Sequence, residues 1–179
     1  VADPSPWIAR FAPLVRAGAR VLDLACGRGR HARFFAACGC EVVAVDRDAE
    51  ALATLAGVPG VTALEADLEG APWPLAGASF DAIVVANYLH RPLFAPLLDA
   101  LAPDGVLLYE TFMAGNEAFG RPSNPAFLLH PGELLDVARG RLDVVAFEQG
   151  RVRGSERDAV VQRLAAVGKA RGGSALLPA

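Results

Sequence analysis

The sequence predicts an α/β protein with one doubly wound, mostly parallel sheet of seven strands. Apolar runs of strand length alternate with helical stretches over the first 112 residues. These runs are apolar at nearly every position, as in strands covered on both faces. The last third of the chain adds two strand-like runs that we interpret as an antiparallel pair. With 179 residues, 53% of them hydrophobic, the chain suits a single domain, 1–179.

The first predicted element is a helix within residues 1–18. In SPWIARFAPLV (5–15), Ser5 suits the N-cap and Pro6 suits the first helical position. The apolar residues of one face are Trp7, Ile8, Phe11, Leu14 and Val15. This spacing predicts an amphipathic helix.

Segment 19–112 contains five predicted strands and three predicted helices. The strands are RVLDLA (20–25), EVVAVD (41–46), VTALEAD (61–67), FDAIVVAN (80–87) and GVLLYETF (105–112). The helices are RHARFFAAC (30–38), RDAEALATLA (47–56) and RPLFAPLLDAL (91–101). On such a sheet, ligands bind beyond the carboxyl ends of the strands, at the point where the strand order reverses.

The C-terminal third is predicted to complete the sheet. Segment 113–130 is long for a connection, and its aromatic and apolar residues argue against disorder. We expect it to form a lid over a substrate pocket; the alternative is a loop that only packs on the sheet. The elements expected beyond it, over 131–170, are a helix at 131–139 and strands at 142–150 and 158–170, followed by a poorly ordered tail at 171–179.

Composition restricts the partners. Twenty acidic and 17 basic residues give a net charge of -3, which argues against nucleic acid and anionic membranes and favours a small molecule. No apolar run approaches the ~20 residues that span a bilayer. Cys26, Cys38 and Cys40 form no CxxC pair, which fits a reducing cytoplasm. His31 and His130 have no partner at ligand spacing, so we expect no metal.

Gly27, Gly29 and Ala32 form a G-x-G-x-x-A pattern between a predicted strand and a predicted helix. Missing side chains at such a turn let a ligand approach the backbone amides of the helix N-terminus. The alternative is a glycine turn that holds no ligand. The pattern therefore needs support from neighbouring residues.

Three acidic residues supply that support, because each lies in or at the end of a consecutive strand. Asp23 lies inside the first strand, where a buried carboxylate is costly unless it organises a polar site. Asp46 ends the second strand, where an acid can accept hydrogen bonds from both ribose hydroxyls. Asp67 closes the third. Together they predict a polar edge beside the glycine turn.

VLDLACGRG, VVAVDRD, EADLE and FDAIVVANYLH, in this order and spacing, resemble the successive motifs of class I S-adenosylmethionine-dependent methyltransferases. The resemblance covers 20–112 and implies a Rossmann-like fold with S-adenosylmethionine as cofactor. The cofactor-binding residues that it implies are Asp23, Ala25, Gly27, Gly29 and Arg30 around the methionine part, Asp46 at the ribose, Arg47, Asp67 and Leu68 at the adenine, and Ala86 and Asn87 over the methionyl amine. Arg30 also has an alternative interpretation as an exposed first-turn residue.

YETFMAGNEAFGRPSNPAFLLHPGELL (109–135) further resembles small bacterial members known as tellurite-resistance-like methyltransferases. The chain departs from many members at Cys26, where they carry glycine or another small residue. We interpret the thiol as a small filler of the turn and not as a nucleophile, because the sulfonium carries the chemistry.

Methyl transfer is an in-line displacement, so the protein must align an acceptor with the methyl group and exclude water. The candidate catalytic residues are Tyr88, His90 and Tyr109. The candidate substrate contacts are Arg91, Glu110, Asn116 and Arg121. For the catalytic candidates and Glu110 the alternative roles are structural: a packing aromatic, a residue at a helix start or a surface acid.

The main prediction is an enzyme that methylates a small molecule. The alternatives are a nicotinamide-dependent oxidoreductase, which shares the glycine turn and Asp46, an RNA or protein methyltransferase, and a non-catalytic cofactor-binding module. Amino-group methylation of DNA is disfavoured, because Asn87-Tyr88-Leu89-His90 stands where such enzymes carry an Asn-Pro-Pro-Tyr type sequence.

Overall fold

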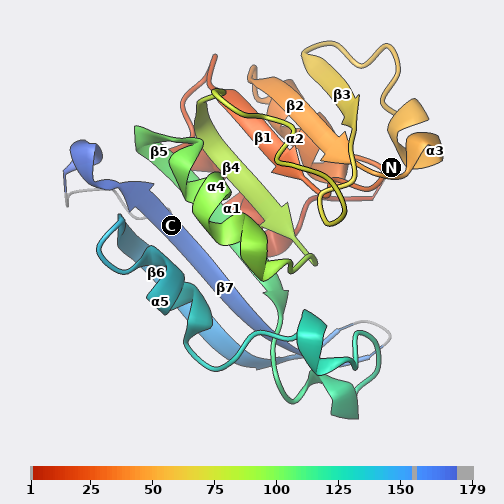
Figure 1. Cartoon of the computed structure of the whole chain (residues 1–179), viewed down its shortest axis with the longest axis vertical. Helices are drawn as coiled ribbons and strands as arrows, with labels where there is room; N and C mark the ends of the chain where they lie inside the picture. The colour runs from red at the N-terminus through yellow and green to blue at the C-terminus, as the bar shows by residue number, and fades with distance from the viewer. Residues whose placement is uncertain (1, 155–156, 173–179) are drawn as a thin grey trace.

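The computed structural model describes residues 2–154 and 157–172 (Figure 1). The predicted tail, 171–179, lies mostly outside these residues. One sheet has the strand order β3-β2-β1-β4-β5-β7-β6. The strands are β1 Arg20–Leu24, β2 Glu41–Asp46, β3 Val61–Glu65, β4 Phe80–Ala86, β5 Leu101–Phe112, β6 Leu142–Val152 and β7 Ala159–Gly168.

The topology confirms the doubly wound sheet. Strands β1 to β5 pair in parallel, and the strand order reverses between β1 and β4. Strand β7 runs antiparallel between β5 and β6, so the C-terminal pair completes the sheet as expected. In the part of the chain that the structure describes, no helix is long and apolar enough to cross a membrane.

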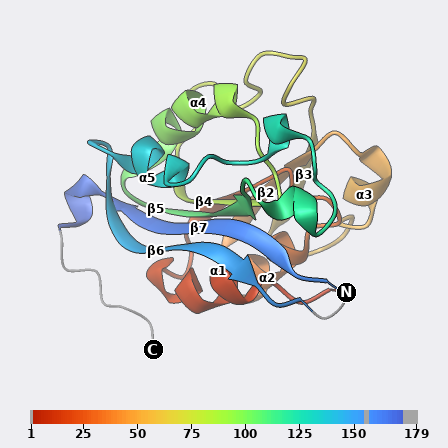
Figure 2. The ribbon, with the colours of Figure 1, turned by 90° about the horizontal axis from the view of Figure 1, so that it is seen from below.

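Helices cover both faces of the sheet (Figure 2). Helices α4 and α5 lie on one face, and α1 and α2 lie on the other. Their bounds are α1 Pro6–Phe11, α2 Arg30–Ala37, α3 Ala49–Ala53, α4 Phe94–Asp99 and α5 Glu133–Ala138. Each face has its own core cluster, because neighbouring strand residues point to opposite sides: Leu107 belongs to the cluster with α4, and Leu108 to the cluster with α1.

Side-chain caps set two helix starts. The Ser5 hydroxyl accepts a hydrogen bond from the Trp7 amide at 3.2 Å, as the N-cap prediction requires. Helix α3 is shorter than the predicted 47–56, because the Asp48 carboxylate accepts from the Ala51 amide at 3.0 Å and makes Asp48 the cap.

Two strands differ from the predicted ranges. Strand β5 begins at Leu101 and not at residue 105, with a register shift against β4 between Phe80 and Ala82. Strand β3 ends at Glu65 and is largely exposed, because it is an edge strand and lacks a neighbour on one side. Asp67 therefore lies in the turn beyond β3 and not in the strand.

Candidate functional site

The reversal of strand order between β1 and β4 creates the site. Ala25 follows β1 and Asn87 follows β4, with φ angles of 53° and 57°. They are the two non-glycine residues with positive φ in residues 2–154 and 157–172. This conformation is costly for side chains other than glycine and is concentrated at functional sites.

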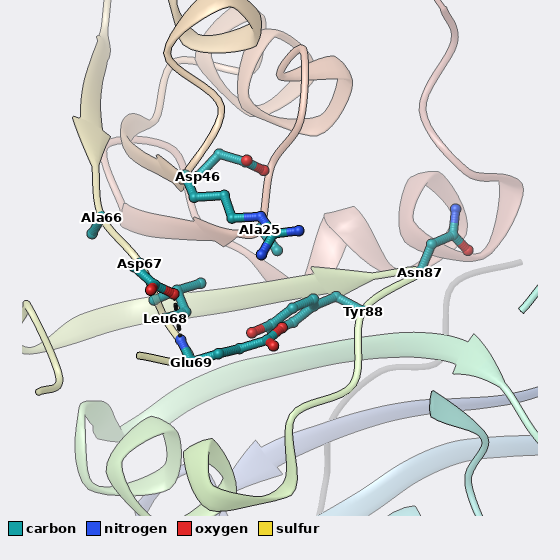
Figure 3. Close-up of a pocket in the computed structure, with 9 residues that line it drawn as sticks. Ala25, Asp46, Ala66, Asp67, Leu68, Glu69, Asn87 and Tyr88 are labelled. Carbon is teal, nitrogen blue, oxygen red and sulfur yellow. Dashed lines mark hydrogen bonds between the residues drawn. The ribbon is translucent and has the colours of Figure 1, made fainter. Parts of the chain in front are cut away.

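The Asp46 pocket is a cavity of about 280 Å³ at the carboxyl ends of the strands (Figure 3). Its lining residues are Ala25, Asp46, Arg47, Ala66, Asp67, Leu68, Glu69, Asn87 and Tyr88. Figure 3 shows the Tyr88 ring beside the Glu69 side chain, away from Asp46. The pocket combines carboxylates, one cation and apolar surface.

The Asp23 pocket is a second cavity, of about 310 Å³. Its lining residues are Ala2, Asp23, Ala25, Cys26, Gly27, Arg28, Arg30, His31, Ala86 and Asn87. Because both pockets are lined by Ala25 and Asn87, they are neighbouring halves of one cleft. Every predicted cofactor-binding residue except Gly29 lines this cleft.

The glycines of the turn have different reasons for lacking a side chain. Both have positive φ, 54° at Gly27 and 72° at Gly29. A Cβ atom at Gly27 would meet no atom within 4 Å, so this residue borders open space. A Cβ atom at Gly29 would collide with the Leu55 side chain. Gly27 therefore faces the cleft. The missing side chain of Gly29 lets the start of α2 pack against Leu55, which follows α3.

The Asp46 carboxylate connects β2 to the glycine turn. Its Oδ2 accepts a hydrogen bond from the Gly27 amide at 2.7 Å, and its Oδ1 accepts from the Asp48 amide at 3.0 Å. Nearby, Asp67 Oδ1 accepts from the amides of Glu69 and Gly70, and these bonds lower the pKa of Asp67. The carboxylates of Asp46 and Asp67 are thus oriented by backbone amides.

Asp23 is 1% exposed, and its Oδ2 accepts from the Ala32 amide of α2 at 2.8 Å. Burial raises the pKa of Asp23 to about 7, although the Ala32 bond and the Arg30 charge oppose the shift. Burial and the Asp23 charge also raise the pKa of the Cys26 thiol. A neutral thiol agrees with the interpretation of Cys26 as a filler, because the thiolate is the nucleophilic form.

His31 attaches the N-terminal segment to the site. It is 3% exposed, and its Nε2 accepts a hydrogen bond from the Ser5 amide at 3.1 Å. Burial lowers the pKa of His31 to about 4, which keeps the imidazole neutral. Ala2 consequently lies against the Asp23 pocket. The sequence offered no signal for this contact, because it joins segments 26 residues apart.

The three candidate catalytic residues occupy different environments. Tyr88 lines the Asp46 pocket, and its buried hydroxyl has no hydrogen-bond partner among the described residues. Burial, with the Glu69 charge, raises the pKa of Tyr88. His90 is half-buried and lines neither pocket. Tyr109 is buried, and its hydroxyl donates to the Tyr88 carbonyl at 2.9 Å, a contact that supports the Tyr88 backbone.

Arg91 is not free to bind a substrate in this structure. Its guanidinium donates to the two Glu133 carboxylate oxygens at 2.7 and 2.9 Å, and to the carbonyls of Ala126 and Leu128 at 3.0 and 2.9 Å. These contacts hold segment 113–130 beside α5. Arg91 as a substrate contact stays a prediction, and its guanidinium is occupied by these contacts in this structure.

The other three candidate substrate contacts also lie outside both pockets. Glu110 is buried on β5 and forms an ion pair with Arg163, 3.2 Å away. Asn116 is 2% exposed; its Nδ2 donates to the Pro122 carbonyl at 3.0 Å, and its Oδ1 accepts from the Val160 amide at 3.1 Å. These contacts occupy the Glu110 carboxylate and the Asn116 amide in this structure, and the two substrate assignments stay predictions.

Arg121 is exposed, and its carbonyl accepts from Arg157 at 2.8 Å. Segment 113–130 lies beyond the carboxyl end of β5 (Figure 1) and lines neither pocket. Its Leu128 and Leu129 are buried. These contacts favour the packed-loop interpretation over the expected lid.

The sequence was compared with known families and proteins. A family model described as a methyltransferase domain matches residues 21–105, the segment that contains the glycine turn and β1 to β4. No curated protein sequence matches the chain significantly.

Solved structures share the fold. TehB from Haemophilus influenzae superimposes with a TM-score of 0.80 and 17% identity over 94% of this chain, which spans 64% of the length of that protein. A TehB-like SAM-dependent methyltransferase from Corynebacterium glutamicum gives a TM-score of 0.63 and 24% identity, covering 89% of this chain and 88% of that one. The glycopeptide N-methyltransferase MtfA, solved with sinefungin, gives 0.64 and 20%, covering 94% and 87%.

Proposed function

We propose that the chain, whose residues 21–105 match a methyltransferase-domain model, transfers a methyl group from S-adenosylmethionine to a small-molecule acceptor. The observation that supports this most directly is the cleft at the β1 and β4 ends, in which the Asp46 carboxylate is bonded to the Gly27 amide. Sinefungin, held by one structural neighbour, is an analogue of the same cofactor.

The cleft fits this cofactor in chemistry and shape. The Asp46 pocket offers carboxylates for ribose hydroxyls and for an adenine amino group, with Leu68 as apolar surface. The Asp23 pocket offers a buried carboxylate for a cation and Arg30 for a carboxylate. Open space at Gly27 leaves room between them. We assign the adenosine part to the Asp46 pocket and the methionine part to the Asp23 pocket.

The chain contributes alignment and exclusion of water. The bound cofactor supplies an electrophilic methyl group on a sulfonium, which needs no protein nucleophile. Tyr88 lines the Asp46 pocket, and its buried hydroxyl lies beside the Glu69 side chain. We retain Tyr88 and His90 as candidate acceptor contacts, and assign Tyr109 to positioning the Tyr88 backbone.

A methyl-transfer assay tests the proposal. Purified protein is incubated with S-adenosylmethionine and, separately, with small thiols, amines and chalcogen oxyanions, while formation of S-adenosylhomocysteine is measured. Turnover with one of these classes supports the proposal. Turnover only with RNA or protein contradicts a small-molecule acceptor. Cofactor binding without turnover on any of these acceptors favours the non-catalytic module.

A further inference from the structure

The segment before α1 reaches the Asp23 pocket and is anchored at its last residue. Ser5, the N-cap of α1, is 4% exposed, whereas Ala2 and Asp3 before it are exposed. Ala2 nevertheless lines the Asp23 pocket. In Figure 2 this segment extends from α1 toward the carboxyl ends of the parallel strands. Residues 2–5, which we call the N-terminal arm, therefore contribute one wall of the pocket.

The anchor of the arm is the imidazole of His31. This side chain is 3% exposed and lines the Asp23 pocket, and its Nε2 accepts a hydrogen bond from the Ser5 amide at 3.1 Å. His31 lies in the first turn of α2, next to Ala32, whose amide donates to the Asp23 carboxylate. One turn of α2 therefore binds both the buried carboxylate of the pocket and the arm that forms its wall.

The arm is stiff, and the helix that follows it is fixed to the sheet. Pro4 and Pro6 flank Ser5, and the ring of each proline fixes its own φ. Ser5 is extended, with φ -55° and ψ 138°. Helix α1 is held by Trp7, which is 3% exposed and whose indole donates to a β7 carbonyl at 3.4 Å. Because α1 is fixed, the arm can move only as a short unit about Ser5.

We propose that His31 is a positioning residue that, through its bond to Ser5, holds the N-terminal arm over the methionine part of the bound cofactor. The inference rests on the proposed function, because it takes the methionine part to lie in the Asp23 pocket. Since the Nε2 atom of His31 is occupied by the Ser5 amide, the imidazole acts on the ligand through the arm. A closed arm also helps to exclude water from the site, as methyl transfer requires.

The arm should retain cofactor and product alike, because S-adenosylmethionine and S-adenosylhomocysteine share the amino-acid end of the methionine part. Without the His31 bond the arm turns away and the pocket opens beside Ala2. We expect the Kd of both ligands to rise about tenfold, the factor that corresponds to the loss of one buried hydrogen bond. A bond that only holds α1 on the sheet would instead lower the free energy of unfolding and leave both Kd values unchanged.

Two substitutions remove this bond from opposite ends, and either one tests it if the other does not fold. His31→Ala removes the acceptor. Ser5→Pro removes the amide donor, and the φ of -55° at this position suits proline. Ser5→Ala is the matched comparison for Ser5→Pro, because both lose the hydroxyl that caps α1 and only proline lacks the amide hydrogen. His31→Gln is the conservative variant, whose side-chain oxygen can accept from the Ser5 amide.

Titration calorimetry with S-adenosylmethionine and with S-adenosylhomocysteine gives the Kd of each variant, and circular dichroism checks that the variants are folded. The Kd of both ligands should be about tenfold higher in His31→Ala than in wild type, and about tenfold higher in Ser5→Pro than in Ser5→Ala. His31→Gln should restore most of the lost affinity. The double variant should bind no more weakly than the weaker single variant, because both substitutions remove the same bond.

Unchanged Kd values in folded His31→Ala overturn the inference. A higher Kd in His31→Ala that Ser5→Pro does not reproduce also overturns it, because His31 would then act on the ligand directly. Both results leave the proposed function intact. If the folded wild-type chain binds neither ligand, the proposed function fails, and the inference fails with it.

Discussion

The Asp46 carboxylate accepts a 2.7 Å hydrogen bond from the Gly27 amide, which joins the end of β2 to the glycine turn after β1. The same carboxylate also accepts from Asp48. A side chain fixed in this way costs little entropy to order when a ligand binds. Asp46 is therefore preorganised at the place where the proposed ribose contacts are needed.

Replacing Asp46 should weaken cofactor binding more than it lowers the stability of the fold. Asp46→Ala removes charge-assisted hydrogen bonds, and we expect a loss of about 1–3 kcal/mol in binding of S-adenosylmethionine, which is roughly 5- to 150-fold in Kd. Titration calorimetry measures this directly. Glu41→Ala, on the exposed first residue of β2, is the matched control. An unchanged Kd in Asp46→Ala would remove Asp46 from the site.

The raised pKa of Asp23 predicts how stability depends on pH. Because the native state holds this proton up to about pH 7 and the unfolded chain only up to about 3.8, the free energy of unfolding falls as pH rises through that window. The full cost above pH 7 is on the order of 4 kcal/mol. Asp23→Asn without cofactor should therefore gain stability relative to wild type between pH 4 and pH 8.

Urea unfolding of both proteins at several pH values checks this prediction. Taking the difference between variant and wild type cancels the other titrating groups. The advantage of Asp23→Asn should grow steadily with pH. Curves that stay parallel from pH 4 to pH 8 would show that Asp23 is ionised in the native state throughout.

The Arg91 contacts predict a stability effect that is separate from cofactor binding. Arg91→Ala removes the guanidinium from Glu133 and from two carbonyls, and we expect a loss of about 1–3 kcal/mol in the free energy of unfolding. Arg139→Ala removes an exposed ion pair with Asp136 and should cost close to nothing. Weaker cofactor binding in Arg91→Ala, with the free energy of unfolding unchanged, would instead identify Arg91 as a ligand contact.

Hydrogen exchange distinguishes a lid from a packed loop at 113–130. Because Asn116, Arg91 and buried leucines already hold this segment, we expect S-adenosylmethionine to protect amides within residues 21–90 and to leave 113–130 unchanged. Exchange measured by mass spectrometry with and without cofactor resolves the two segments. Slower exchange in 113–130 on cofactor binding would support the lid instead.

The sheet and the cleft were predictable because their signals are local. Near-continuous apolar runs identify the buried strands, and Gly27, Asp23 and Asp46 stand at strand ends that a parallel sheet brings to one edge. Residues near the ends of neighbouring parallel strands therefore lie close together in space. The exposure of the edge strand β3 was harder to predict, because it depends on the absence of a neighbouring strand on one side.

The residues outside the cleft were harder to assign because their partners are distant in sequence. Asn116 bonds to a backbone amide 44 residues away, and Arg91 to a carboxylate 42 residues away. Nothing near either residue in the chain indicates these contacts. The Tyr109 hydroxyl donates to the Tyr88 carbonyl. This contact depends on how the segment after β4 packs against β5. Position after a predicted strand placed Arg91 and Tyr109 among the site candidates, and position in the long segment 113–130 placed Asn116 there.

We propose that the cleft between the β1 and β4 ends binds S-adenosylmethionine. Titration calorimetry of the purified chain with S-adenosylmethionine and, separately, with NAD tests it most directly. We expect saturable micromolar binding of S-adenosylmethionine alone, and weaker binding in Asp46→Ala. Binding of NAD alone would contradict it and would favour an oxidoreductase, with the roles given to Asp67 and Asn87 withdrawn.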